Sequence, residues 1–241
     1  MEILYEAAIG PDRRLVERDF LVQLSHQLLS YAATVQALAD LLGKGHRSPE
    51  HIPPELFQIL PLLVRDLEVL GYKALLLENP VPAATHLPVN PARLIDETIE
   101  IFSLRDRDRP LIKNYPSDLP HICGNEEQIR IVLDNLLSNA FKYSPPKTSI
   151  IIAAERYKGL SERCSGQIII SVTNSGSFVS QDEQALIFNK FYRGKGVDQP
   201  GQGLGLYLSR CLVEMQGGQL EVESSPAEGT TFWFTLPVIA A

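Results

Sequence analysis

Apolar residues recur along the first eighty positions of the chain in alternating steps of three and four. Two runs have this spacing: Leu21, Leu24, Leu28, Tyr31, Val35, Leu38 and Leu42, and then Leu56, Leu60, Leu63, Leu67, Leu70, Ala74 and Leu77. This heptad spacing predicts two helices that pack in a bundle. The segment from Gly43 to Pro54 is rich in glycine, serine and proline and predicts the turn between them.

A hairpin of two amphipathic helices cannot close an apolar core by itself. Two copies would close a four-helix bundle, so we expect a homodimer formed through residues 15–78. The same apolar residues are also compatible with packing against the neighbouring domain of the chain.

The remaining sequence alternates helical and strand-like patterns. Apolar spacing predicts helices over residues 92–104, 125–142 and 203–216. The polar segment from Tyr157 to Gly166 lies between two strand-like runs and predicts a hairpin loop.

Three polar residues share one side of the predicted helix 125–142. At about 100° per residue, Asn135, Asn139 and Lys142 fall within about 60° of one another, beside the apolar face. Amide groups can hydrogen-bond phosphate oxygens or ligate a hard cation, and a lysine can bind an anionic phosphate. Taken alone, such a stripe is more often a solvated polar flank. The apolar face beside it comprises Ile129, Val132, Leu133, Leu136, Leu137 and Ala140.

A glycine-rich segment precedes the third predicted helix. It predicts a flexible loop that leads into a buried helix, where unpaired backbone N–H groups can bind phosphate. A lone glycine cluster is more often a turn, but together with the asparagine stripe it is a much stronger signal. The glycines lie within twelve positions: Gly194, Gly196, Gly201, Gly203 and Gly205.

These segments resemble, in order and approximate spacing, the motifs of the sensor histidine kinases. Asn135 to Tyr143 resembles the asparagine box, Ile187 to Gly194 the phenylalanine box, and Gly201 to Leu206 the second glycine box. Gly217 to Ser224 and Gly229 to Pro237 resemble the two closing strands of the family's catalytic domain. The resemblance covers roughly residues 85 to 237.

The resemblance implies an α+β chain in two parts. Residues 1–80 would form a dimerisation and phosphoacceptor helical hairpin, which is half of a dimeric four-helix bundle. Residues 81–241 would form an α/β-sandwich ATPase domain of the histidine-kinase, gyrase and chaperone type, with a mixed sheet covered on one face by the three helices. ATP would lie between the last two helices, under the loop from Arg193 to Gln202.

The resemblance also assigns roles in binding ATP and Mg²⁺. Asn139 would ligate Mg²⁺, Asn135 and Lys142 would hold phosphates and associated water, Tyr143 would line the pocket, and Asn174 would contact adenine. Gly203 and Gly205 would offer backbone N–H groups to the phosphates. Further nucleotide contacts are expected at Gly176, Phe188, Arg193, Gly201, Leu204 and Leu206.

His26 lies away from the apolar seam of its predicted helix. A histidine in that setting is most often a solvated polar residue, but the segment from Ser25 to Ser30 resembles the family's phosphoacceptor box. The resemblance therefore implies that His26 takes the γ-phosphoryl group of ATP. It would then pass this group to an aspartate on a response-regulator receiver domain.

Several positions depart from the family pattern. Gln27 replaces an acid, which would reduce an acid–base contribution typically worth ~10²–10⁴-fold. Leu29 and Tyr31 replace the usual arginine and proline, and Asn174 replaces the adenine-binding aspartate, at a cost of about 1 kcal/mol. Phe178 replaces a glycine and is expected to strain the backbone or obstruct close approach.

Two alternatives to an active histidine kinase follow. The first is a pseudokinase that acts as a nucleotide-sensing or dimerisation scaffold for a partner kinase. The second is a serine kinase of the same fold, of the anti-sigma-factor type. Asn135 disfavours hydrolytic relatives, which normally have a glutamate there. Only about twenty residues precede the hairpin, so we expect a separate sensor or partner kinase to supply the signal.

Composition favours a cytoplasmic regulator. A net charge of -7 argues against nucleic acid and anionic membrane as partners. No apolar run approaches the ~20 residues that span a bilayer, and Met1 to Gly10 has acidic residues where a signal peptide has basic ones. Three isolated cysteines indicate neither a disulfide framework nor a zinc site.

Overall fold

The computed structural model describes residues 22, 25, 28–35, 67, 69–71, 74, 87–156, 166–176, 178–194 and 203–239. The chain divides into two compact units, Met1–Asn79 and Pro80–Ala241, and each is described by itself. In the first unit, residues 28–35 are helical. His26, Gln27, the turn at 43–54 and most of the two heptad runs lie outside the described residues, as does the predicted hairpin loop at 157–165.

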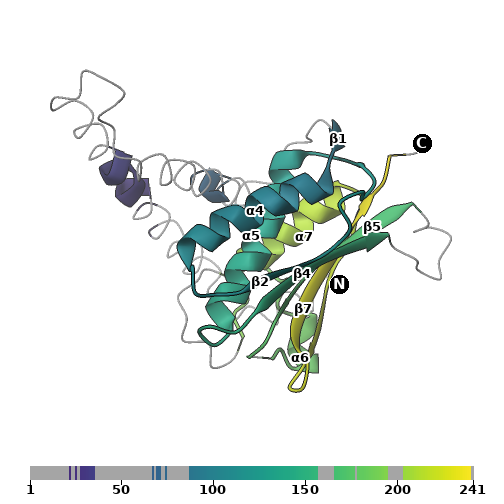
Figure 1. Cartoon of the computed structure of the whole chain (residues 1–241). Coiled ribbons are helices and arrows are strands. Elements are labelled where there is room, and N and C mark those ends of the chain that lie inside the picture. The colour runs from purple at the N-terminus through teal and green to yellow at the C-terminus, as the bar shows by residue number, and fades with distance from the viewer. Residues whose placement is uncertain are drawn as a thin grey trace, which may run out of the picture. The chain divides into compact units, whose positions relative to one another are not determined.

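The second unit is built on a five-stranded mixed sheet with the order β2-β4-β5-β7-β6 (Figure 1). β2 and β4 pair in parallel, and the other neighbours pair antiparallel. The closing strands β6 and β7 match the expected final pair. The five strands are β2 Leu111–Asn114, β4 Ile150–Arg156, β5 Gln167–Asn174, β6 Leu220–Ser225 and β7 Gly229–Pro237.

Three helices cover one face of this sheet: α4 Pro91–Arg105, α5 Glu126–Tyr143 and α7 Gly205–Met215 (Figure 1). This arrangement is the expected one, and the bounds differ slightly. Asn125 is the N-cap of α5, and α7 begins two residues later than predicted because Gly203 has φ +66, which a right-handed helix does not allow. A two-stranded sheet of β1 Leu87–Val89 and β3 Ile122–Gly124 and a short helix, α6 Gln181–Gln184, were not predicted.

The core lies between the helices and the sheet. Every second residue of β5 is buried, from Ile168 through Ile170 to Val172, because successive side chains point to opposite faces. The predicted apolar face of α5 is buried in full. None of the described helices is long and apolar enough to cross a membrane.

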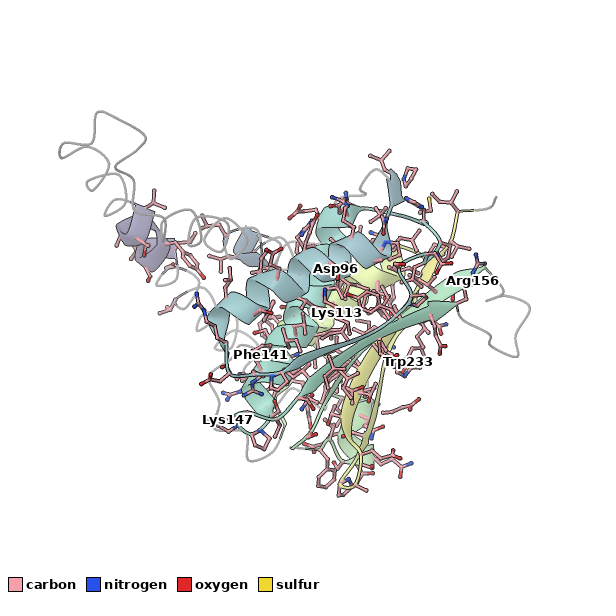
Figure 2. The ribbon with its side chains drawn as sticks, viewed as in Figure 1. Asp96, Lys113, Phe141, Lys147, Arg156 and Trp233 are labelled. Atoms are coloured by element: carbon pink, nitrogen blue, oxygen red, sulfur yellow. The ribbon has the colours of Figure 1, made fainter. Side chains whose placement is uncertain are left out.

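The edge strand β2 is attached to α4 by a polar cluster. Lys113 of β2 and Asp96 of α4 face one another and form an ion pair (Figure 2), and the Tyr115 hydroxyl donates to Asp96 Oδ1 over 2.9 Å. Partial burial raises the pKa of Asp96, but the hydrogen bonds from Lys113 and Tyr115 outweigh it and hold that pKa below its ordinary value. The carboxylate therefore stays charged in neutral solution.

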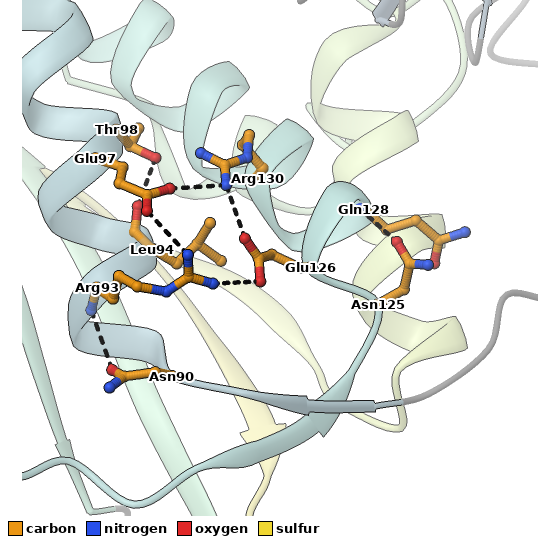
Figure 3. A network of polar contacts seen from close by, with 9 residues as sticks. All are labelled: Asn90, Arg93, Leu94, Glu97, Thr98, Asn125, Glu126, Gln128 and Arg130. Carbon is orange, nitrogen blue, oxygen red and sulfur yellow. Dashed lines mark hydrogen bonds and ion pairs between the residues drawn. The ribbon is translucent and has the colours of Figure 1, made fainter.

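The start of α5 is held by side chains on several sides (Figure 3). Asn125 Oδ1 accepts from the Gln128 N–H at 2.9 Å and so caps the helix. Arg93 and Arg130 bridge Glu97 of α4 and Glu126 of α5.

The end of α7 reaches the same place. Buried Gln216 donates to Gln128 Oε1 at 2.5 Å and accepts from the Asn125 N–H at 2.8 Å. Because buried amides are costly to leave unpaired, this cross-link fixes α7 against α5.

Candidate nucleotide-binding site

The predicted polar stripe is present on α5. Asn135, Asn139 and Lys142 are partly exposed and lie beside the buried face of the helix. Within the part of the chain that the structure describes, the Asn139 amide has no hydrogen-bond partner. A partly buried amide oxygen without a protein partner is suited to ligating a hard cation such as Mg²⁺.

Asn135 joins the stripe to the start of α7. Its amide Nδ2 donates to the Gly205 carbonyl at 3.4 Å and to Ser209 Oγ at 3.3 Å. Since a carbonyl oxygen only accepts, Nδ2 must be the atom that faces Gly205. The remaining Oδ1 of Asn135 is an acceptor, so it suits a water molecule or a cation rather than a phosphate oxygen.

No side chain caps the first turn of α7. Its N-cap is Leu204, which is buried, makes no capping hydrogen bond, and is followed by no acidic residue in the first turn. The first backbone N–H groups of a helix have no partner within the helix, and the helix dipole places positive charge there. An anion such as phosphate is therefore favoured at this position.

Two glycines beside this turn differ in why they must be glycine. At Gly203, φ is +66, and a Cβ would lie 2.5 Å from the Tyr192 carbonyl oxygen, so the fold itself excludes a side chain. At Gly205, the nearest atom to a Cβ would be Asn135 Oδ1 at 3.5 Å, which is ordinary contact. The described neighbours leave room for a methyl group at Gly205. Because glycine lacks that group, the same space is open to a ligand.

The phenylalanine box meets the second glycine box through the backbone. Phe191 has φ 66, and its N–H donates to the Gly203 carbonyl at 2.9 Å. Phe188 is buried against Phe232 of β7, with a ring distance of 6.4 Å, and the Arg210 guanidinium lies 5.2 Å from the Phe188 ring. Phe188 therefore anchors this segment inside the protein.

Two further residues complete the phenylalanine box. The Tyr192 hydroxyl donates to Glu183 Oε1 at 3.1 Å, and Arg193 is exposed. Burial raises the pKa of Tyr192, and its bond to the Glu183 carboxylate raises that pKa further. The tyrosine therefore remains neutral and keeps donating in neutral solution.

The residues that the resemblance assigns to adenine lie around the end of α5. Asn174, the last residue of β5, is 4% exposed and donates from Nδ2 to the Ser175 carbonyl at 3.3 Å. Gly176 has φ +117, and a Cβ there would lie 3.2 Å from the Tyr143 carbonyl oxygen. The Lys142 ammonium lies 4.9 Å from the centre of the Tyr143 ring. The structure thus brings Tyr143 against the segment that follows Asn174.

The expectation of backbone strain at Phe178 is wrong. Its side chain is 52% exposed, and among the described non-glycine residues only Lys147 and Phe191 have positive φ. The left-handed conformation in this segment belongs to Gly176. A bulky residue is tolerated at position 178 because it extends into solvent.

Sequence patterns missed Ser209, which is buried and joins Asn135 to α7. Ser209 lies one turn after Gly205, and its neighbours Leu208 and Leu212 belong to the core. A polar residue beside core positions of a helix was the signal that could have identified it. Leu206 is partly exposed in the first turn of α7, whereas Gly201 and His26 lie outside the described residues.

Residues 124–240 match the family described as histidine kinase-, DNA gyrase B-, and HSP90-like ATPase. The adaptive-response sensory kinase SasA of Synechocystis sp. is 31% identical over 90% of this chain and 58% of that kinase. The chain therefore spans less than two thirds of the length of this curated relative.

Solved structures show the same fold. The mycobacterial sensor histidine kinase MprB matches with a TM-score of 0.56 and 25% identity, over 65% of this chain and 99% of that structure. The structure of full-length ShkA in complex with AMPPNP matches with a TM-score of 0.62 and 25% identity, over 92% of this chain and 46% of that one.

Proposed function

This chain belongs to the sensor histidine kinase family, and we propose that it is an ATP-dependent protein kinase of a two-component system, phosphorylated on His26. The observation that carries the proposal is the facing pair of Asn135 on α5 and the uncapped first turn of α7 at Gly205. One element supplies amides for a cation and its water, and the other supplies unpaired N–H groups for phosphate.

The arrangement supports a division of roles within the nucleotide site. Asn139 would ligate Mg²⁺ through Oδ1, Asn135 would accept a hydrogen bond from water bound to that ion, and Lys142 would neutralise phosphate charge. The amides of the first turn of α7, beginning at Gly205, would hold the phosphates. Adenine would lie against Tyr143 and be recognised through the Asn174 amide.

The chemistry would be phosphoryl transfer by positioning and charge neutralisation. A ring nitrogen of His26 would attack the γ-phosphorus in line, the bond from that phosphorus to the bridging oxygen would break, and ADP would leave. The histidine would lose its ring proton to water, because Gln27 next to it has no basic group to take that proton. The phosphoryl group would then pass to an aspartate of a response-regulator receiver domain.

Labelling with γ-labelled ATP tests the reaction. We expect slow incorporation of a label that is lost in acid, survives in base and disappears in His26→Ala, because a phosphoramidate has those stabilities. Gln27→Glu should speed labelling by up to the ~10²-fold lower bound for acid–base catalysis. A label that persists in His26→Ala would contradict the proposal and indicate the serine-kinase alternative.

Calorimetry tests the nucleotide site separately. We expect magnesium-dependent ATP binding, in the high micromolar range or above because the adenine contact is an amide. Asn139→Ala should abolish the magnesium dependence, and Asn174→Asp should tighten binding by about fivefold to tenfold. The absence of binding at millimolar ATP would rule out the kinase.

Dimerisation through residues 15–78 remains part of the proposal. Leu28 and Val35, two residues of the first heptad run, are each 48% exposed in the single chain, and a partner helix would cover them. Sedimentation should show a dimer that Leu28→Asp breaks, because the charge would be buried without a partner. A monomer at every concentration would contradict it.

The second candidate function is a nucleotide-binding scaffold without phosphoryl transfer. The observation that favours it is the buried Asn174, whose Nδ2 is bonded to the neighbouring Ser175 carbonyl and whose amide replaces the acid that normally binds adenine. Measurable ATP binding together with no label under any condition would establish this alternative.

A further inference from the structure

Arg109, between α4 and β2, has an almost completely buried guanidinium with three described contacts. Its side chain is 5% exposed; Nε donates to Asp106 Oδ2 at 3.2 Å, one terminal nitrogen donates to Ser144 Oγ at 2.5 Å, and the guanidinium carbon lies 5.1 Å from the centre of the Phe141 ring. A buried charge is costly unless it is paired and hydrogen-bonded. These contacts offset that cost and fix the guanidinium in one geometry.

Two of these contacts lie at the C-terminal end of α5. Phe141 is in the last turn, and Ser144 is the C-cap residue. The Ser144 hydroxyl, which accepts from Arg109, also donates to the Ala140 carbonyl at 2.5 Å. Arg109 therefore orients the hydroxyl group that satisfies a carbonyl of the final turn, where helices otherwise fray.

The Gly176 turn after β5 lies close to the same helix end. A Cβ at Gly176 would lie 2.5 Å from Pro145 Cδ, 3.2 Å from the Tyr143 carbonyl oxygen and 3.3 Å from Ser144 Cα. The residues that end α5 thus lie close both to the Arg109 guanidinium and to the backbone of the Gly176 turn.

We propose that Arg109 is a positioning residue for nucleotide binding, which acts through Ser144 and does not contact the nucleotide. It fixes the last turn of α5, with Lys142 and Tyr143, at the distance from the Gly176 turn that the adenine side of the site requires. The inference rests on the proposed ATP site. Arg109 lies 33 positions before Lys142 and belongs to none of the sequence motifs.

The experiment compares Arg109→Met with Arg93→Met in the full chain. Arg93 is a matched control because it is also an arginine that pairs with acidic side chains, here Glu97 and Glu126 at the opposite end of α5, but its side chain is 52% exposed. Calorimetric titration with Mg-ATP should show binding weakened by about tenfold in Arg109→Met and unchanged in Arg93→Met. Unchanged binding in Arg109→Met, with normal binding in the wild type, would overturn the proposal and leave the ATP site standing.

Ser144→Ala supplies an independent variant that keeps the buried charge and its Asp106 partner. It should also weaken Mg-ATP binding. The double variant Arg109→Met/Ser144→Ala should have the same affinity as whichever single variant binds Mg-ATP less tightly, because both changes remove the same contact. If the two effects multiply, Arg109 does not act through Ser144. If Arg109→Met fails to fold, unchanged Mg-ATP affinity in folded Ser144→Ala overturns the proposal.

Hydrogen exchange in the absence of nucleotide separates failure of this inference from failure of the ATP site. Arg109→Met should raise amide exchange in residues 140–148 and leave residues 126–133 at the start of α5 unchanged. A purely structural role would raise exchange along the whole helix, and that result would overturn the inference. If Arg109→Met shows the local exchange effect but the wild-type protein binds no ATP, only the proposed function is contradicted.

Discussion

α5 and α7 pack on the same face of the sheet, but the backbone N–H groups at their starts are treated differently. At α5, Asn125 caps the first turn, and Glu126 and Glu127 place negative charge at the positive end of the helix dipole. Gln216 accepts a hydrogen bond from the Asn125 N–H. At α7, the N-cap is Leu204, no side chain caps the turn, and no acid lies in it.

The α5 start is thus satisfied by the protein's own side chains, whereas the N–H groups at the α7 start are available to a ligand. Helix N-termini expose donors that must be satisfied by side chains, water or a ligand. The α5 start is satisfied internally, so it should contribute to stability and not to nucleotide affinity. The α7 start should do the reverse, and the following variants test that separation.

The largest change in stability is expected for Gln216→Ala. The variant removes both hydrogen bonds of the Gln216 amide and leaves the Asn125 N–H and the Gln128 side-chain oxygen unsatisfied, which should lower the free energy of unfolding by about 2–3 kcal/mol. Urea denaturation measures this change. Gln219→Ala, at an exposed position three residues further on, is the control and should change little.

Gly205→Ala should have the opposite effect at α7. A methyl group fits its described surroundings and alanine favours helix, so the free energy of unfolding should stay the same or rise by up to about 1 kcal/mol. The methyl group would occupy the space for phosphate and weaken Mg-ATP binding by about tenfold. Calorimetry and thermal unfolding on one sample separate the two; unchanged affinity would remove the distinction between the helix starts.

Asn125→Ala should destabilise the fold by about 1 kcal/mol, because it removes the cap of α5. Asn125→Asp keeps the accepting oxygen and should remain close to the wild type. Mg-ATP affinity should be the same in both variants. Weaker binding in the alanine variant would show that the α5 start is coupled to the nucleotide site.

The smallest effect is expected for Arg93→Met. Both of its ion pairs are on the surface, where water and salt screen them, so the free energy of unfolding should change by less than about 0.5 kcal/mol. The difference should shrink further in 1 M salt. A larger change would mean that surface charge, rather than the buried cap and glutamine, holds the α5 start.

The sequence predicted the helices and the stripe on α5 because each depends on local periodicity, and the mixed sheet followed from the resemblance of its motifs to those of a known family. It did not predict the bond from Gln216 to Gln128, 88 positions apart, or that from Arg109 to Ser144, 35 positions apart. Such pairs depend on how the elements pack, and no local pattern encodes them. The two roles of glycine at 203 and 205 are also invisible in sequence, since they depend on φ and on neighbouring atoms.

The hydrogen bond from the Phe191 N–H to the Gly203 carbonyl bears on how well the chain tolerates inserted residues. This bond joins the two ends of the segment 191–203 and holds them at a fixed separation. Both end residues have φ 66. A longer connection between fixed ends adds only closure entropy, about 0.6 kcal/mol for each doubling of its length. Residues inserted between these two positions should therefore leave β5, α5 and α7 in register, so that the length of this segment can vary without a change in the rest of the domain.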